Sequence, residues 1–205
     1  MTKIAKIVKS NSHVDYVGRV IDVLDAAAPP TSDDYGFAQF VSIPVGDDEE
    51  IVGVIYNTEL ANPEYGSFGP RLSPRADLSV LSPDYLNEQG ILVGVLLLGT
   101  RGRKGDGNDS AWSNTHGVPR RVIPVGQDVY RLNDADAYGF HKSADGFVHL
   151  HYYSQVIAHA REFAVPLLEA ILGQLEPACP PEERQRLCVL RKSLVWQRTM
   201  GGMRL

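Results

Sequence analysis

The first 132 residues form a series of short apolar segments separated by turn signals, and no helical pattern interrupts them. The segments mix alternation with β-branched residues, which is typical of strands. Many short strands without intervening helices favour a sandwich or a closed barrel. We therefore expect a closed β-barrel over residues 1–134. Its strands are expected at Ile4–Val8, Val14–Val23, Phe37–Val45, Ile51–Tyr56 and Ile91–Gly99, with a strand pair or bend at Arg121–Leu132.

Three connecting segments are predicted between these strands. The acidic residues 47–50 join two strands and are expected to form a solvated turn. Residues 59–86 are dense in Pro, Gly and Ser, which indicates an irregular stretch. Residues 99–117 are rich in Gly and carry three basic side chains, so a flexible loop is expected there. Residues 91–99 are apolar on both faces, which predicts the most buried strand.

The period changes to a helical one after about residue 150. Apolar residues recur at spacings of three and four from Val156 to Leu175, which predicts an amphipathic helix with a kink or split at Pro166. A second helix is expected from about Glu182 to Met200, because a proline and two acids precede it and two glycines follow it. The predicted fold is therefore mainly β with α, an N-terminal barrel followed by a C-terminal helical hairpin within residues 135–205.

Charge is divided unevenly along the chain, although the formal net charge is only −5. Residues 1–100 carry 14 acidic and 6 basic side chains, a net of −8, whereas residues 101–205 carry 11 and 14, a net of +3. Such an asymmetry suggests two different surfaces. The hydrophobic share of 43% excludes a disordered chain.

The chain is expected to be cytoplasmic. The segment 1–9 is basic but lacks a continuous apolar stretch, so it does not resemble a signal peptide. The longest strongly apolar run, Ile91–Leu98, is too short to cross a bilayer. The two cysteines, Cys179 and Cys188, are expected to be reduced thiols.

No motif of nucleotide hydrolysis or nucleophilic catalysis is found. In the Gly-rich segment that follows residue 99, Lys104 precedes Gly105 and Asp106 instead of a Ser or Thr at the start of a helix, so it is not a P-loop. No Gly-x-Ser-x-Gly elbow is present either. We therefore predict no catalytic residue and no cofactor.

Three histidines suggest a different function, metal binding. His149 and His151 lie two residues apart and would share one face of a strand, with His141 just upstream. A metal-dependent hydrolase built on these three residues is a second alternative, because metal sites need three or four converging ligands. Packing and hydrogen bonding are the more usual roles for such residues.

The C-terminal segment carries six basic residues and no acidic one after Glu183. Arg184, Arg191 and Arg198 are seven apart, so on a helix they would form one stripe beside an apolar line of leucines, with Trp196 further round. This pattern predicts either a helix that docks an acidic partner or nucleic acid, or one that packs on the chain's own acidic barrel. The pattern leaves both interpretations open.

The barrel segment resembles the HAS-barrel, the β-barrel shared by HerA-type DNA translocases and ATP synthase subunits. The resemblance lies in Gly18–Val23 with Phe40–Ile43, in Glu50–Tyr56, and in Ile91–Thr100 followed by Pro119–Leu132. In HerA-type motors the barrel precedes a RecA-like domain, whereas a helical pair follows it here. The resemblance therefore implies subunit assembly and partner docking, and it implies no motor. Self-assembly into a homo-oligomer is a further expectation from the resemblance.

The sequence thus predicts a non-catalytic assembly or adaptor protein without a membrane segment. The resemblance suggests a ring ATPase or a DNA-processing nuclease as its protein partner. The main alternative is a nucleic-acid-binding barrel that uses the 101–104 segment and the basic C-terminal helix. The candidate contact residues for a partner or for nucleic acid are Arg101, Arg103, Lys104, Arg120, Arg121, Arg184, Arg191, Lys192, Trp196 and Arg198.

Overall fold

The computed structural model describes residues 1–63, 65, 84, 88–104, 111–143 and 145–201, with the backbone alone at 104, 111 and 197–201. Most of the stretch predicted to be irregular, 59–86, lies outside the described residues. The strands are β1 (Lys3–Ser10), β2 (Asp15–Val20), β3 (Phe40–Pro44), β4 (Glu49–Ala61), β5 (Gly90–Lys104), β6 (Ala111–His116) and β7 (Asp128–Arg131).

The predicted barrel is confirmed. The strands are hydrogen-bonded in the order β2-β1-β7-β3-β4-β5, and β5 pairs again with β2, which closes an antiparallel barrel of six strands. β6 pairs with β5 and extends the sheet beyond the barrel. Within the predicted 121–132 strand pair or bend, only Asp128–Arg131 is a strand.

β5 is the strand around which the barrel closes. Its first half lies between β2 and β4, with Arg19 opposite Leu92 and Asp15 opposite Leu96 in the β2 pairing. The side chains of Val93, Val95 and Leu96–Leu98 are fully buried. The prediction of a strand apolar on both faces is confirmed, because one face packs in the barrel and the other lies under other elements.

The predicted flexible loop over residues 99–117 is wrong. β5 continues to Lys104, and Ala111–His116 returns as β6, so most of this segment is a hairpin. This part of the strand has no alternation of apolar residues. Instead, Arg101 and Arg103 alternate with small residues and share one face of the strand. Residues 105–110, between the two strands, lie outside the described residues.

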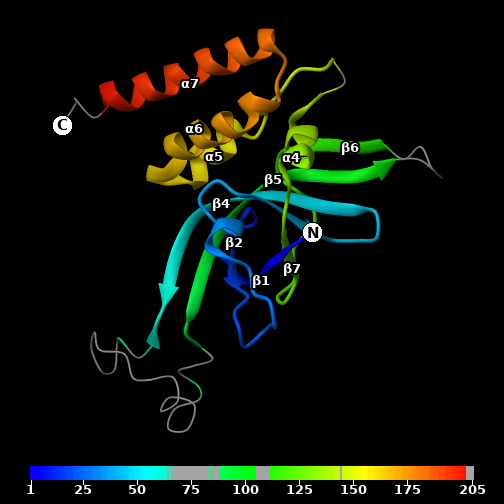
Figure 1. Ribbon diagram of the computed structural model, residues 1–205, viewed down its shortest axis with the longest axis vertical. Coiled ribbons are helices and arrows are strands. Elements are labelled where there is room, and N and C mark those ends of the chain that lie inside the picture. The colour runs from blue at the N-terminus through cyan, green and yellow to red at the C-terminus, as the bar shows by residue number, and fades with distance from the viewer. Residues whose placement is uncertain (64, 66–83, 85–87, 105–110, 144, 202–205) are drawn as a thin grey trace.

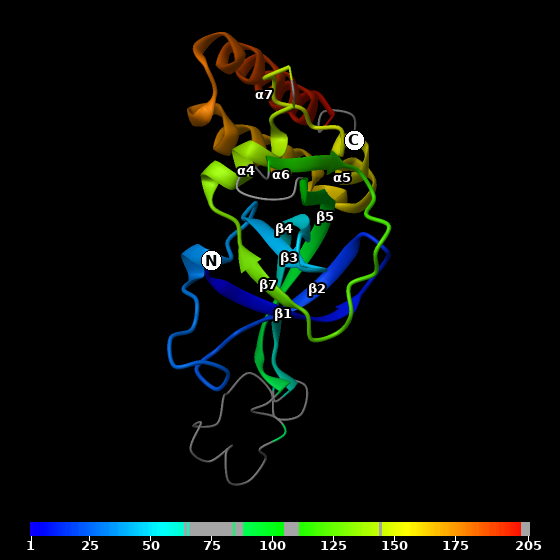
Figure 2. The same ribbon diagram turned by 90° about the vertical axis from the view of Figure 1, so that its right-hand side faces the viewer.

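The helices gather at one end of the barrel (Figures 1 and 2). They are α4 (Asp134–His141), α5 (Tyr153–His159), α6 (Ala164–Leu175) and α7 (Pro181–Gly201), with short 3-10 turns η1 (Ser32–Asp34), η2 (Arg161–Phe163) and η3 (Glu176–Ala178). α6 and α7 form the predicted hairpin, to which α4 and α5 are added. Both cysteines are free thiols.

The predicted first helix is divided earlier than expected. α5 ends at His159 and α6 begins at Ala164, whereas the break was expected at Pro166. Pro166 instead lies in the first turn of α6, where a backbone N–H has no partner within the helix and proline is tolerated. The break falls at η2, where Arg161 adopts a φ of 48°, a left-handed conformation that ends the helical path.

Barrel and helices share one continuous core. The buried apolar residues of the strands and of α4, α5, α6 and α7 form one cluster. Two glutamines join the layers: Gln155 of α5 donates to the carbonyl of Leu97 in β5, and Gln174 of α6 donates to the carbonyl of Ala38, at 3.0 Å. The boundary near residue 134 therefore marks a change from strand to helix within a shared core. No helix among the described residues is long and apolar enough to span a bilayer.

Gly99 provides a test of the β5–β6 pairing. A Cβ at this position would come far inside van der Waals contact of the Thr115 carbonyl oxygen and within 3.0 Å of the His116 Cα. We expect Gly99→Ala to lower the free energy of unfolding by about 2 kcal/mol or more, because backbone atoms must shift. In the control, Gly139→Ala in α4, the new Cβ meets nothing within 4 Å, so stability should stay equal or rise. Urea denaturation of both variants distinguishes these outcomes, and equal stabilities would contradict the pairing.

Candidate functional site

α7 is the outermost element of the helical layer, and α6 lies between it and the barrel (Figure 1). Its buried side chains are Glu183, Leu187 and Leu194, which face α6 and the segment before α5. Glu183 accepts a hydrogen bond from the backbone N–H of Val148. The basic helix therefore packs on its own helical layer, and the interpretation in which it packs on the acidic barrel is wrong.

Two of the three arginines spaced by seven residues bind groups of the protein itself. Arg184 donates to the carbonyls of Glu176, Pro177 and Cys179 at 3.1–3.2 Å, where it satisfies the end of the preceding helical segment. The Nε of Arg191 lies 3.2 Å from the Glu176 carboxylate. Arg184 and Arg191, two members of the predicted stripe, therefore stabilise the α6–α7 connection.

Lys192 and Trp196 remain exposed on α7, and Trp196 keeps 65% of its surface accessible. They lie on the side of the helix opposite Leu187 and Leu194, because each residue turns an α-helix by about 100°. Val189 lies on the same outer side, seven residues before Trp196, and is also exposed. Arg198 belongs to α7, and its side chain lies outside the described part of the chain.

An apolar groove of about 310 Å³ runs beside α7. Leu190 is 44% exposed at its rim, although Leu187 and Leu194 on either side are buried. Sequence reasoning placed these three leucines on one line. On a helix, however, Leu190 is rotated by about 60° from Leu187, and this rotation is the signal that could have identified the groove. The groove is lined by Leu150, Tyr153, Leu168, Leu172, Leu190, Ser193 and Leu194.

The basic residues predicted on the barrel are scattered rather than gathered. Arg103 and Arg120 are exposed, and Lys104 ends β5 with its side chain outside the described residues. Arg121 binds Glu49 at 3.0 Å and the carbonyl of Val45 at 2.9 Å. Figure 1 shows the β5–β6 hairpin and the C-terminal end of α7 on opposite sides of the molecule, so the two predicted basic groups do not form one surface.

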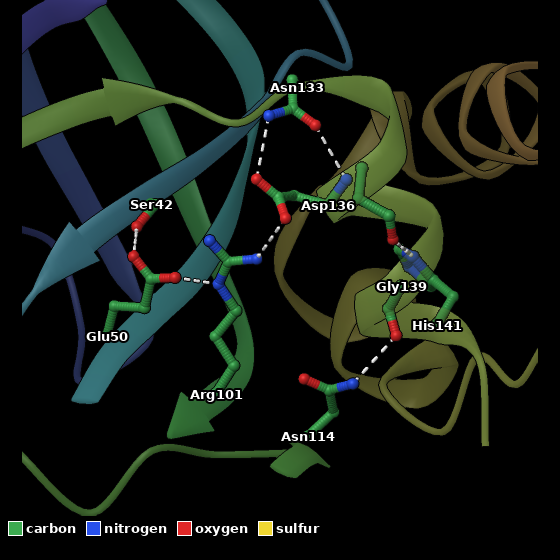
Figure 3. A network of polar contacts seen from close by, with 9 residues as sticks. Ser42, Glu50, Arg101, Asn114, Asn133, Asp136, Gly139 and His141 are labelled. Carbon is green, nitrogen blue, oxygen red and sulfur yellow. Dashed lines mark hydrogen bonds and ion pairs between the residues drawn. The ribbon is translucent and has the colours of Figure 1, made fainter. Parts of the chain in front are cut away.

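Arg101, predicted as a surface contact, is instead buried with 2% of its surface exposed. Its Nε donates to the Glu50 carboxylate, and its Nη1 lies 3.4 Å from a carboxylate oxygen of Asp136 (Figure 3). Ser42 donates to the other oxygen of Glu50. A charge can remain inside a protein when it is paired and hydrogen-bonded in this way. The expectation that Glu50 belongs to a solvated turn is therefore also wrong, although Asp47 and Asp48 are exposed.

The same network fixes the start of α4. Asn133 caps this helix, because its Oδ1 accepts from the N–H of Asp136 at 2.8 Å and its Nδ2 donates to the Asp136 carboxylate at 2.9 Å. Burial lowers the pKa of the Arg101 guanidinium, and the charge of Asp136 acts in the opposite direction. The arginine thus ties strands β4 and β5 to α4 through two carboxylates.

The histidines pack against aromatic rings. His141 is buried, its Nδ1 donates to the carbonyl of Ala137 at 2.6 Å, and its Nε2 accepts from the Tyr152 hydroxyl at 2.6 Å. Both nitrogens are therefore occupied. The rings of His149 and His151 contact each other in a tilted arrangement, with centroids 4.9 Å apart. Among the residues that the structure describes, no group of three His, Cys, Asp or Glu side chains is arranged to hold a metal ion.

Burial of His141 should make the fold sensitive to acid. Burial lowers the pKa of its imidazole to about 3, whereas an unfolded chain titrates near 6.5. The unfolded state therefore binds a proton that the native state excludes, and stability is lost as the pH falls from 6.5 toward 3. We expect the free energy of unfolding to fall between pH 6.5 and 5 by up to about 1.4 kcal/mol per pH unit from this residue. His141→Gln should reduce that slope in urea titrations, and an unchanged slope would contradict the assignment.

Removing one partner of the buried network should be costly. Glu50→Gln leaves the guanidinium of Arg101 with one carboxylate, so we expect a loss of about 3 kcal/mol in the free energy of unfolding. Asp48→Asn, in the exposed turn just before β4, should change stability by less than about 0.5 kcal/mol. The double variant Glu50→Leu with Arg101→Met should lose less than the sum of its single changes. Additive losses in chemical denaturation would argue against the pairing.

Comparison with known proteins gives a family but no named relative. No curated protein matches the chain. A family model described as "Domain of unknown function (DUF8166)" matches residues 1–204, which include the barrel and all of the helices. The chain therefore belongs to this family, the domain of unknown function DUF8166.

Proposed function

We propose that the protein is a non-catalytic assembly or adaptor protein that docks a partner protein at the groove beside α7. The observation that carries this proposal is the apolar groove itself, with Leu190 and Tyr153 both more than 40% exposed at its rim. Exposed apolar surface next to basic side chains is typical of an interaction site. α7 also carries apolar residues outside the side that packs on α6, so a partner can contact them.

The occupant that fits this groove is an amphipathic helix with acidic residues beside its apolar face. The groove lies between helices and is lined almost entirely by leucines and a tyrosine, which suits apolar side chains spaced by three and four residues. Arg186, one helical turn before Leu190, is exposed on α7, and no acidic residue follows Glu183 in the sequence. Charge complementarity therefore favours an acidic partner segment.

The resemblance to the HAS-barrel suggests which proteins to test first. It supports a partner among HerA-type ring ATPases or DNA-processing nucleases, since barrels of that type serve assembly. The nucleic-acid alternative receives less support, because Arg101 is buried and the remaining basic groups lie apart. His141 gives little support to the hydrolase alternative, because both of its ring nitrogens already form hydrogen bonds within the protein.

The partner can be identified by photo-crosslinking in the host cell. A photo-reactive phenylalanine analogue replaces Leu190 at the groove, and in the control it replaces Leu60, which is exposed on β4. We expect position 190 to form an adduct whose crosslinked peptide is an acidic amphipathic helix, and position 60 to form none with that protein. Adducts only with a second copy of this chain, only with nucleic acid, or with nothing would overturn the proposal.

The affinity can then be measured with the purified partner, beginning with a HerA-type ATPase of the same host. Leu190→Asp should weaken binding at least tenfold, because it places a negative charge in an apolar groove facing an acidic helix. Leu60→Asp is the matched control and should leave the affinity unchanged. Trp196→Ala tests the outer side of α7. If Trp196→Ala abolishes binding and Leu190→Asp does not, the partner does not occupy the groove and the proposed site is wrong.

A further inference from the structure

A second cavity, of about 570 Å³, lies between the β5–β6 hairpin and α4. The pairing places Arg101 opposite Asn114 and Arg103 opposite Trp112, so these four side chains share one face of the hairpin. The opposite wall comes from α4 and the residues after it, including Phe140 and Lys142. This volume falls within the range of sites for small ligands.

Trp112 is held in place from within the protein. The guanidinium carbon of Arg101 lies 4.4 Å from the centroid of its ring and that of Arg103 lies 5.2 Å away. Arg101 is itself fixed by Glu50 and Asp136, so it is a rigid support for the indole. Trp112 still exposes 39% of its surface. A planar ligand could therefore stack on an aromatic surface that is already positioned.

Asn114 offers a hydrogen-bond acceptor without a partner. Its Nδ2 donates to the carbonyl of Gly139 at 2.8 Å, which fixes the orientation of the amide (Figure 3). Its Oδ1 is buried and has no hydrogen-bond partner among the described residues. A buried acceptor of this kind is normally satisfied by a donor, either on a ligand or on water. The side chain of Lys142, also in the wall, adds a positive charge.

We propose that this cavity binds a nucleotide, either free or at a single-stranded nucleic acid. The base would stack on Trp112 and donate an N–H to the Oδ1 of Asn114, and the phosphate would lie toward Lys142. Aromatic stacking with hydrogen bonds to the base edge is a common mode of recognition for unpaired bases. Around the cavity, the cations Arg101, Arg103 and Lys142 outnumber the carboxylates of Glu50 and Asp136, which favours an anionic ligand.

The cavity uses different residues from the groove beside α7. The proposed nucleotide site is therefore independent of the partner-docking proposal. It also differs from a binding mode based on basic charge alone, because its specificity would come from Trp112 and Asn114. An anion that lacks a base should bind weakly or not at all.

The test uses the full chain with Trp196→Phe, which leaves Trp112 as the only tryptophan. Adenosine and cytidine monophosphates and short oligonucleotides are titrated at low salt while the fluorescence of Trp112 is recorded. We expect saturable quenching, and little response to inorganic phosphate or ribose 5-phosphate. Saturation by the mononucleotides indicates a free nucleotide, and saturation by oligonucleotides alone indicates a strand. No saturable response to any base-bearing ligand, or an equal response to ribose 5-phosphate, would overturn the proposal.

Variants locate the site. Asn114→Ala should weaken binding at least fivefold, and Lys142→Ala should weaken it and reduce its salt dependence. Lys192→Ala on α7 is the control and should have no effect. Because Asn114→Ala also removes the bond to Gly139, its thermal unfolding is measured in parallel, and the indole N–H signal of Trp112 is followed by NMR. Full binding by folded Asn114→Ala would exclude the proposed contact.

Discussion

Arg101 carries a positive charge into the interior, and the arrangement of the surrounding elements depends on how that charge is satisfied. An unpaired guanidinium would cost several kcal/mol at this depth. Glu50 from β4 and Asp136 from α4 provide the two carboxylates, so the barrel and the first helix must meet at this point. The same guanidinium supports Trp112, which places an exposed aromatic ring on the extended hairpin. A single buried ion network therefore determines the position of α4 and the form of the second cavity.

The helices next to the barrel bury more of their side chains than the outermost helix does. α5 and α6 contribute many fully buried residues, and the side chains of Gln155 and Gln174 bond to barrel carbonyls. The described side chains of α7 include few buried ones, mainly Leu187 and Leu194. Elements with little buried apolar surface lie at the low end of local stability, and binding elements are commonly found there. The position of α7 is thus consistent with a surface that gains stability from a partner.

Features that depend on the spacing of apolar residues could be predicted from the sequence. The closed barrel, the burial of most of the 91–98 strand segment and the α6–α7 hairpin follow from patterns of apolar residues, because burial imposes those patterns directly. The errors fall where a side chain has an unexpected partner. Arg101 and Glu50 were placed at the surface by composition, although each satisfies the other inside the protein. Their pairing joins residues 51 positions apart, and local spacing contains no information about such a contact.

The charge asymmetry between the two halves also has a local explanation. Ion pairs such as Glu49 with Arg121 and Glu50 with Arg101 join the halves, whereas Glu176 and Arg191 balance each other within the second half. Among the described basic side chains singled out from the sequence, five are exposed, and they lie on three different segments: Arg103 on β5, Arg120 and Arg121 between β6 and β7, and Arg184 and Lys192 on α7. Net charge alone therefore does not define a binding surface. What distinguishes the two proposed sites is the combination of a cavity with an exposed apolar or aromatic side chain, Leu190 in one and Trp112 in the other.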